Sequence, residues 1–435
     1  RKGVGKCLAN SKNDSIWQAF VNLLPGKVSL GFPAAKAKFL RSAKSIEAPS
    51  VEEYRNVSRE YCLYALEGAR GDAKRIIDLA SNIDCFRLSG TICEMADAVG
   101  RECSGWDDLQ RYEIWRLVAE YVERCSRHAG AKWAPSEESL IRLSNLSRAI
   151  RPTGDYYDVL RAFSVDYVKW KKVYEDRNAS CKDAGDTPYA TLERLVQNEG
   201  VQVASRLISN GANAAILGGA FAHIGISLEG KDACLRMLNQ EGKEQVEFAQ
   251  SFALACFSDN GWDWIDQIDS DALTERGAAM LYSALPLSKE TWQRAEAVLG
   301  DGADVFWRQA SGRIDIDTNA DACYCAERLL GVNRSDMATF VVCHAIENGI
   351  AVDADAVTKT VEASVLFAEG DAGYFVGQLV SYLERTSPSG SLWDLELRFP
   401  MLVKDRTDSL LFEEMSNSPA LFSKAVFLAC GMDRG

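Results

Sequence analysis

The sequence predicts an all-α protein in which short helices stack in pairs. Apolar residues recur at spacings of three and four, as in Val118, Tyr121, Val122 and Cys125, which is the periodicity of an amphipathic helix. No alternating run of strand length is bracketed by Asn-Gly or Asp-Gly, so convincing strands are missing. The 10 prolines fall between the helical patterns. We therefore expect a helical-pair solenoid of the tetratricopeptide-like or HEAT-like kind, or an irregular α-superhelix, with a large irregular bundle as the alternative.

The first 50 residues differ from the rest of the chain in charge and punctuation. Residues 1–46 hold nine Lys or Arg and one acid, a charge of +8, and the remainder carries −21 of the total of −13. Gly-Phe-Pro punctuation predicts loops around a short apolar stretch at Trp17–Leu24. We define residues 1–50 as a basic, loop-rich N-terminal segment. Its basic amphipathic part contains the candidate docking residues Lys36, Lys38, Arg41 and Lys44.

Two helical regions follow this segment. Residues 51–180 predict a helical subdomain with longer helices and many aromatic side chains. The polar stretch Glu175–Asp186 has no large apolar residue and is typical of a linker. From 187 to 435 we expect a helical-repeat array, because helix pairs recur at about 30–40 residues. The expected helices are Leu192–Asn198, Val201–Ser209, Ala212–Ile224, Asp232–Asn239, Glu244–Phe257, Ala272–Ala284, Lys289–Leu299, Ala320–Leu330, Asp336–Glu347, Ala354–Ala368 and Ala372–Glu384.

Cysteine usage and hydropathy indicate a cytoplasmic protein. The 13 cysteines are scattered and none forms a Cys-x2-Cys pair; most lie inside helical patterns, where Cys acts as a small apolar residue. No run approaches the roughly 18 apolar residues of a membrane helix, and no signal peptide follows Arg1. We expect no membrane contact. Because the chain begins with Arg1 rather than Met, we also expect it to be a piece of a longer protein.

Motifs for enzymatic chemistry are incomplete in this sequence. Gly3–Cys7 resembles the end of a phosphate-binding loop, but Cys7 stands where that loop needs a hydroxyl. The histidines His128, His223 and His344 are far apart and lack metal-ligand spacing. We therefore predict no catalytic residue, no cofactor and no metal. An all-α enzyme with an unrecognised acidic site is kept as an alternative.

The segment Asp315–Asp321 places oxygen-bearing side chains at alternate positions, as a calcium loop does. Ala320 replaces the turn glycine of that loop, and Ala326 replaces its bidentate Glu. Helix N-capping by Asp317 or Asn319 explains the same residues and is the interpretation that we favour.

Charge distribution limits the classes of partner. A strongly acidic body argues against nonspecific binding of nucleic acid or membranes over most of the surface. The basic N-terminal segment could contact nucleic acid, and a nucleic-acid-associated repeat protein remains an alternative. We favour docking of this segment onto other domains of the same chain, because the acidic body would attract it first.

Several packing elements resemble a known group of proteins. Leu285–Trp292, followed by Val305–Arg308, is similar to an "LP-x4-TW … YWR" element in the carboxy-terminal helical region of very large bacterial proteins related to STAND-type NTPases and antiphage-defence sensors. Glu413–Phe422 resembles a helix start in that region, and Trp17–Gly26 and Gly261–Trp264 are also similar. The resemblance implies that an amino-terminal NTPase or effector supplies the activity, while the helical region senses a partner. This chain shows no Walker motif.

We therefore expect a noncatalytic helical-repeat sensor or scaffold that mediates protein–protein recognition within a larger bacterial antiphage-defence protein. The resemblance implies a phage protein as one partner and homo-oligomers formed through other domains. Trp is enriched at binding hot spots. The candidate partner-binding residues are thus Trp262, Trp264 and Trp393, with packing between helices as the alternative for each.

Overall fold

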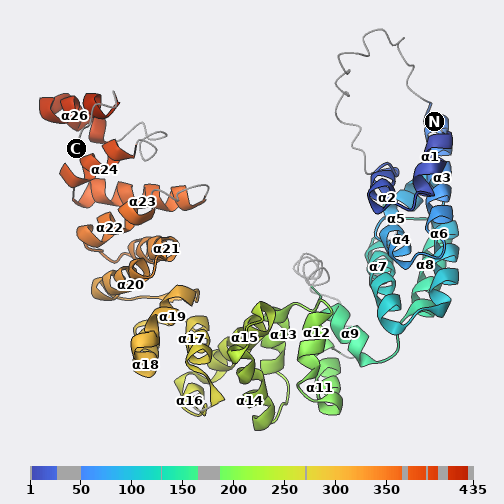
Figure 1. Ribbon diagram of the computed structural model, residues 1–435, viewed down its shortest axis with the longest axis horizontal. Coiled ribbons are helices and arrows are strands. Elements are labelled where there is room, and N and C mark those ends of the chain that lie inside the picture. Colours follow the sequence, from blue (N-terminus) through green and yellow to red (C-terminus); the bar gives the residue numbers. More distant parts are fainter. Residues whose placement is uncertain are drawn as a thin grey trace, which may run out of the picture. The chain divides into compact units, whose positions relative to one another are not determined.

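The protein is mostly helical, which confirms the predicted all-α class (Figure 1). The computed structural model describes residues 2–26, 50–128, 130–164, 187–269, 272–364, 371–387, 390–399 and 410–429. The chain divides into two compact units, Arg1–Leu192 and Glu193–Gly435. The division falls within α11 (Pro188–Glu199). Residues 2–26, expected to belong to a loop-rich segment, form helices of the first unit.

Several helices of the first unit begin at residues whose side chains cap them. Ser50 and Glu53 form a capping box at α3, and Asp107 and Gln110 form another at α7; each box satisfies two backbone N–H groups at a helix start. Before α11, the described helices are α1 (Lys2–Ala9), α2 (Asp14–Val21), α3 (Val51–Gly68), α4 (Ala73–Ala80), α5 (Ile83–Ser89), α6 (Ile92–Glu102), η2 (Cys103–Gly105), α7 (Asp108–Arg127), α8 (Glu137–Ile150) and α9 (Asp155–Ala162).

Aromatic side chains form much of the core of the first unit. α1 packs on α3, α3 on α5, and α8 on both α6 and α7. Trp17, Phe20, Phe86 and Tyr112 are almost completely buried. Full burial of such a side chain contributes on the order of 2–3 kcal/mol to the free energy of unfolding. The many aromatic residues of this part of the sequence therefore stabilise the first unit.

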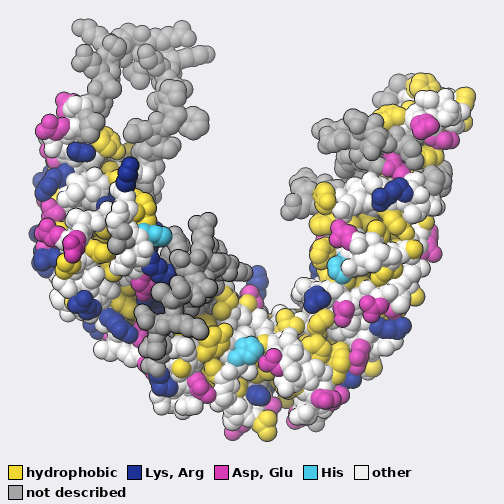
Figure 2. Space-filling model, turned by 180° about the vertical axis from the view of Figure 1, so that it is seen from behind, with side chains coloured by type: hydrophobic (Ala, Val, Ile, Leu, Met, Phe, Trp, Pro, Cys, Tyr) yellow, Lys and Arg dark blue, Asp and Glu magenta, His cyan; other side chains and the backbone are white. Residues whose placement is uncertain are grey.

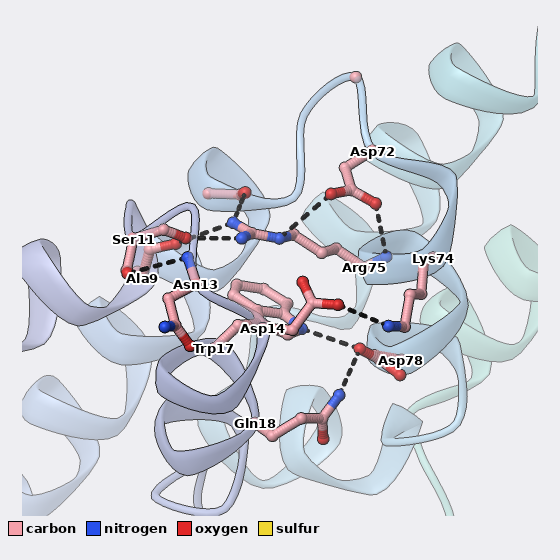
Figure 3. Close-up of polar contacts among 12 residues, drawn as sticks. Ala9, Ser11, Asn13, Asp14, Trp17, Gln18, Asp72, Lys74, Arg75 and Asp78 are labelled. Carbon is pink, nitrogen blue, oxygen red and sulfur yellow. Dashed lines mark hydrogen bonds and ion pairs between the residues drawn. The ribbon is translucent and has the colours of Figure 1, made fainter.

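The guanidinium group of Arg75 connects the N-terminal helices to α4 (Figure 3). Arg75 is buried and donates hydrogen bonds to the carbonyl oxygens of Ala9 at 3.4 Å, Ser11 at 2.5 Å and Gly68 at 2.9 Å. It also forms an ion pair with Asp72 at 3.2 Å. These carbonyl groups lie at the ends of α1 and α3, so one side chain satisfies acceptors that the helices leave open.

Trp17 lies directly beside this guanidinium group. The guanidinium carbon of Arg75 is 4.7 Å from the centroid of the Trp17 ring, which is a cation–π geometry. The indole N–H of Trp17 donates to Asp78 at 2.8 Å, and Gln18 donates to the same carboxylate at 2.8 Å. With the ion pair between Lys74 and Asp14 at 2.7 Å, three polar contacts therefore attach α2 to α4 (Figure 3).

The second unit contains helices joined by short turns. Its described helices after α11 are α12 (Val203–Ser209), α13 (Ala214–Ala222), α14 (Leu228–Arg236), η3 (Met237–Asn239), α15 (Lys243–Asn260), α16 (Trp262–Ile265), α17 (Glu275–Ala284), α18 (Lys289–Leu299), η5 (Gly300–Gly302), α19 (Ala303–Gln309), α20 (Asn319–Gly331), α21 (Ser335–Glu347), α22 (Ala354–Ser364), α23 (Asp371–Thr386), α24 (Gly390–Arg398), α25 (Leu410–Asn417) and α26 (Pro419–Ala429). Two short strands, β1 (Leu287–Ser288) and β2 (Ile314–Asp315), pair in parallel.

Contacts in the second unit join helices that are close in sequence. α15 packs on α13 and α17, α20 on α21, and α22 on α21 and α23. Polar contacts between these helices recur at similar separations: Gln250 donates to Ser283, 33 residues away; Arg328 to Glu296, 32 away; and Tyr382 to the carbonyl of Val352, 30 away. Each helix is therefore fixed mainly by its neighbours in the chain.

The closest helix approach in this region involves α13 and α15. A Cβ added to Gly218 would lie 2.1 Å from the backbone oxygen of Phe248 and 3.1 Å from the backbone nitrogen of Phe252. Only glycine permits this contact, which agrees with the close helix packing that the small residues of this segment predict. Gly219, the next residue, has no atom within 4 Å of such a Cβ.

The cysteines of the described residues are all free, and most are buried. Burial raises the pKa of Cys234 to about 12 and that of Cys256 to about 11, from an ordinary value of 9.0. It also raises the pKa of Cys343 to about 12. A thiolate in these positions would lose its hydration, so the folded chain retains these protons more firmly than the unfolded chain does.

We expect stability to fall under alkaline conditions for this reason. Each such thiol contributes to the free energy of unfolding. This contribution is fully present below pH 9 and is lost as the pH rises towards the folded pKa of the thiol, at about 1.4 kcal/mol per pH unit. The midpoint of urea denaturation, followed by circular dichroism between pH 8 and 10.5, should stay level at first and then decrease. Above pH 9, the urea midpoint of Cys234→Ala should decrease less steeply with pH than that of the wild type. The same steepness in both proteins would contradict the raised pKa of Cys234.

Candidate protein-binding surface around α16

Hydrophobic side chains reach the surface between charged ones at several places (Figure 2). Of the large hydrophobic side chains that the structure describes, Leu228 is the most exposed, at 79%. It is the first residue of α14, which Ser227 caps by accepting a hydrogen bond from the backbone N–H of Gly230. Leu228 lies on the same face of α14 as the buried Leu235, seven positions later, but it stands at the end of the helix and is exposed to solvent.

The short helix α16 carries two of the tryptophans predicted to bind a partner. Gly261 ends α15 and begins α16 with a φ of 63°, a backbone conformation that favours glycine. Ile265 is the buried residue of α16, whereas Trp262 and Trp264 are half-buried. Residues two positions apart on a helix point about 200° apart. The side chains of Trp262 and Trp264 therefore lie on different sides of α16.

Trp264 faces a groove between α14 and α16. The ring of Trp264 meets that of the fully buried Phe252 edge to face, with centroids 6.5 Å apart. The contact with Phe252 thus fixes the position of the Trp264 ring, while part of this ring remains exposed to solvent. The groove has a volume of about 590 Å³ and combines apolar with polar and charged side chains: it is lined by Leu228, Lys231, Asp232, Leu235, Asn260, Asp263, Trp264, Gln267 and Ile268.

Trp262 lies beside a second, more acidic pocket. Its ring meets Phe257 edge to face at 5.0 Å, and the guanidinium carbon of Arg294 lies 4.4 Å from its centroid. Trp262 is therefore partly covered by its own chain. The adjoining pocket has a volume of about 320 Å³ and is lined by Phe257, Trp262, Pro286, Ser288, Lys289, Glu290, Asp315, Asp317 and Asp321.

Charges in the acidic pocket are only partly compensated. Lys289 pairs with Asp321 at 3.2 Å, and Glu290 pairs with Arg294 at 3.0 Å. Within the described part of the chain, Asp315 and Asp317 form no ion pair. Both side chains are exposed. The pocket thus offers two carboxylates to an external cation.

The structure corrects the expected cap of α20. Thr318, rather than Asp317 or Asn319, is the N-cap residue, and its side chain accepts a hydrogen bond from the backbone N–H of Asp321. Thr318 has the extended backbone of an N-cap, whereas Asn319 is already helical. The Asn319 side chain instead accepts a hydrogen bond from the backbone N–H of Asp353 at 3.0 Å. No metal-binding group of three or more His, Cys, Asp or Glu occurs within the described ranges.

Trp393, the third predicted tryptophan, does not line the groove or the acidic pocket. Trp393 is only 8% exposed in α24. Its side chain therefore packs among helices, which was the alternative interpretation, and is not accessible to a partner. The candidate docking residues Lys36, Lys38, Arg41 and Lys44 lie outside the described residues.

The other sequence motifs also have a structural explanation. Gly3–Cys7 lies within the helix α1 rather than in a loop, so its N–H groups are not arranged around a phosphate. His128 contacts the ring of Trp133 at 5.4 Å, and His344 contacts Asn348 at 3.0 Å.

Sequence patterns did not indicate Leu228, Leu235 or Ile268 as site residues. The expected helix began at Asp232, because Glu229-Gly230 reads as a turn. The available signal was Ser227, a good N-cap residue placed directly before Leu228. Counted from this start, Leu228, Lys231, Asp232 and Leu235 lie at helical spacings of three and four, which places the residues that line the groove on one face of α14.

Comparison with known proteins identifies no relative: no protein family, no curated protein and no solved structure matches the chain. The similarity to STAND-type and antiphage-defence proteins therefore remains a prediction. Within the residues that the structure describes, no helix has the length and apolar character required to cross a bilayer.

Proposed function

We propose that the second unit is a noncatalytic helical-repeat scaffold that binds a protein partner at the surface around α16. The observation that carries this proposal is the groove between α14 and α16. The groove is lined by Leu228, which is 79% exposed, by the buried Leu235 and by the half-buried Trp264. Protein–protein interfaces combine apolar and polar side chains in this way, and Trp is enriched at binding hot spots.

The order of contacts in this unit supports a repeat architecture for the scaffold. Neighbouring helices exchange polar contacts at separations of 30 to 33 residues, within the period of helical-pair repeats. In such an array each pair contacts mainly its neighbours, and the whole array presents an extended binding surface. The groove at α16 then lies on one repeat and is available without disturbing the core.

The cellular context of the scaffold is part of the same proposal. The residues that carry the resemblance to antiphage-defence proteins include Trp292 and Trp307, which are buried with ring centroids 6.1 Å apart. Glu296 accepts a hydrogen bond from the indole N–H of Trp307 at 3.0 Å. These residues pack against one another, so the resemblance concerns the packing of helices rather than a chemical site. We place the chain in the cytoplasm, as part of a larger bacterial protein with a phage protein as its partner.

The test compares one surface variant with a matched control. The full chain, Leu228→Glu/Trp264→Ala and Val298→Glu are each used as bait in lysates of phage-infected bacteria. Glu is favourable at a helix start, so Leu228→Glu preserves α14, and Val298 is an exposed apolar residue, at 59%, on α18. We expect a protein retained by the wild type and by Val298→Glu but lost with the double variant. Equal retention by all three baits would contradict the proposal.

A further inference from the structure

We infer that the segment recognised at α16 is basic as well as apolar. Its apolar side chain occupies the groove at Leu228 and Trp264, and a lysine or arginine side chain enters the neighbouring pocket at Asp315 and Asp317. This inference rests on the proposed function and specifies the chemistry of the partner. The partner is thus a protein segment in which an apolar residue lies near a cationic one.

Charge complementarity carries the basic half of the inference. Lys289, the basic residue lining the acidic pocket, is already paired with Asp321 at 3.2 Å. Asp315 and Asp317 form no ion pair among the described residues. A cation arriving between these two carboxylates would gain attraction without first breaking an existing ion pair. An acidic segment or a phosphate backbone would be repelled by the same two charges.

The aromatic wall of the pocket favours a cationic group for a second reason. Phe257 and Trp262 line it, and aromatic faces attract guanidinium and ammonium groups. The chain already uses this chemistry beside the pocket. Arg294 stacks 4.4 Å from the Trp262 centroid and pairs with Asp266 at 2.6 Å. An incoming arginine would find a similar combination of ring and carboxylates at Phe257, Asp315 and Asp317.

The spacing of the two sites limits the partner further. α16 separates the groove from the acidic pocket, and a helix with its side chains is about 10 Å wide. An extended segment advances about 3.3 Å per residue. Side chains alternate between the two faces of such a segment, so an apolar and a basic residue that both face the protein lie two or four positions apart, about 7 or 13 Å. The strand pairing of Ser288 with Asp315 holds the acidic side of the pocket in place.

A peptide-display selection on the full chain tests this inference. Random linear 12-residue peptides are selected at 50 mM NaCl against the wild type, Asp315→Asn/Asp317→Asn, and Asp301→Asn/Glu347→Gln. The last variant removes the same charge from exposed positions elsewhere in the second unit. We expect the wild type and this control to select peptides with an apolar residue and a Lys or Arg two or four positions apart. The Asp315/Asp317 variant should retain the apolar preference and lose the basic one.

Binding of one selected peptide then provides a quantitative measure. Its affinity should fall about tenfold with Asp315→Asn/Asp317→Asn, and increasing NaCl to 500 mM should weaken wild-type binding more than binding to this variant. Apolar peptides without a basic preference would overturn the inference while leaving the proposed function standing. Peptides bound equally by the wild type and by Leu228→Glu/Trp264→Ala would overturn both.

Discussion

Replacing Arg75 with alanine is expected to release α1 and α2 from the first unit. The substitution leaves the carbonyl groups of Ala9, Ser11 and Gly68 without their donor and removes the cation from the face of Trp17. Each buried acceptor left unsatisfied costs about 1–3 kcal/mol. We expect the free energy of local opening of these helices to fall by at least about 3 kcal/mol.

Hydrogen exchange measured by mass spectrometry checks this effect directly. Backbone amides of α1 and α2 should lose their protection in Arg75→Ala, whereas those of α8 should keep it. Arg75→Lys should behave almost like the alanine variant, because an ammonium group lacks the planar fork that reaches three carbonyl groups. Lys74→Ala is the matched control. Its ion pair with Asp14 is exposed, so protection should not change; unchanged protection in Arg75→Ala as well would refute the assigned role.

Gly218→Ala should destabilise the second unit strongly, although it adds a single methyl group. In an exposed helix this substitution normally stabilises by about 0.5–1 kcal/mol. At Gly218, however, the new Cβ would lie 2.1 Å from the backbone oxygen of Phe248. Backbone atoms cannot rotate away as a side chain can, so α13 and α15 must separate. Overpacking of this kind costs about 1–3 kcal/mol.

Gly219→Ala supplies the control within the same helix. Its Cβ would have no atom within 4 Å, so only the gain in helix propensity remains and the variant should be slightly more stable than the wild type. Thermal denaturation followed by circular dichroism compares the two variants. Opposite signs of the shift in Tm are expected. A shift of the same sign and size for both would show that α13 and α15 are not in close contact.

Helices of the second unit could be predicted well because their signals are local. The expected helix Lys289–Leu299 coincides with α18, since Ser288 caps it and Gly300 follows it. The shortest elements were not predicted, because they carry little local signal in the sequence. α16 has four residues and α19 has seven, too few turns for a hydrophobic period to emerge. The strands β1 and β2 have two residues each and exist because distant segments meet.

The binding surface could be predicted only in part. Trp262 and Trp264 were identified by residue type, and both lie on the surface around α16. Trp393 was selected by the same criterion but is buried, because the position of a tryptophan relative to neighbouring helices depends on tertiary packing. The carboxylates of Asp315 and Asp317 could not be predicted as part of this surface, because it is the pairing of β1 with β2 that places them next to α18.

The regular separation of contacts in the second unit also determines how that unit folds. Closing a loop of about 30 residues costs nearly the same entropy wherever it occurs in the chain. Gln250 can therefore contact Ser283, and Arg328 can contact Glu296, before segments that are far apart in the sequence come together. Low contact order of this kind favours fast folding. It also lets terminal helices open while central ones stay closed, so that unfolding proceeds in stages from the ends inward.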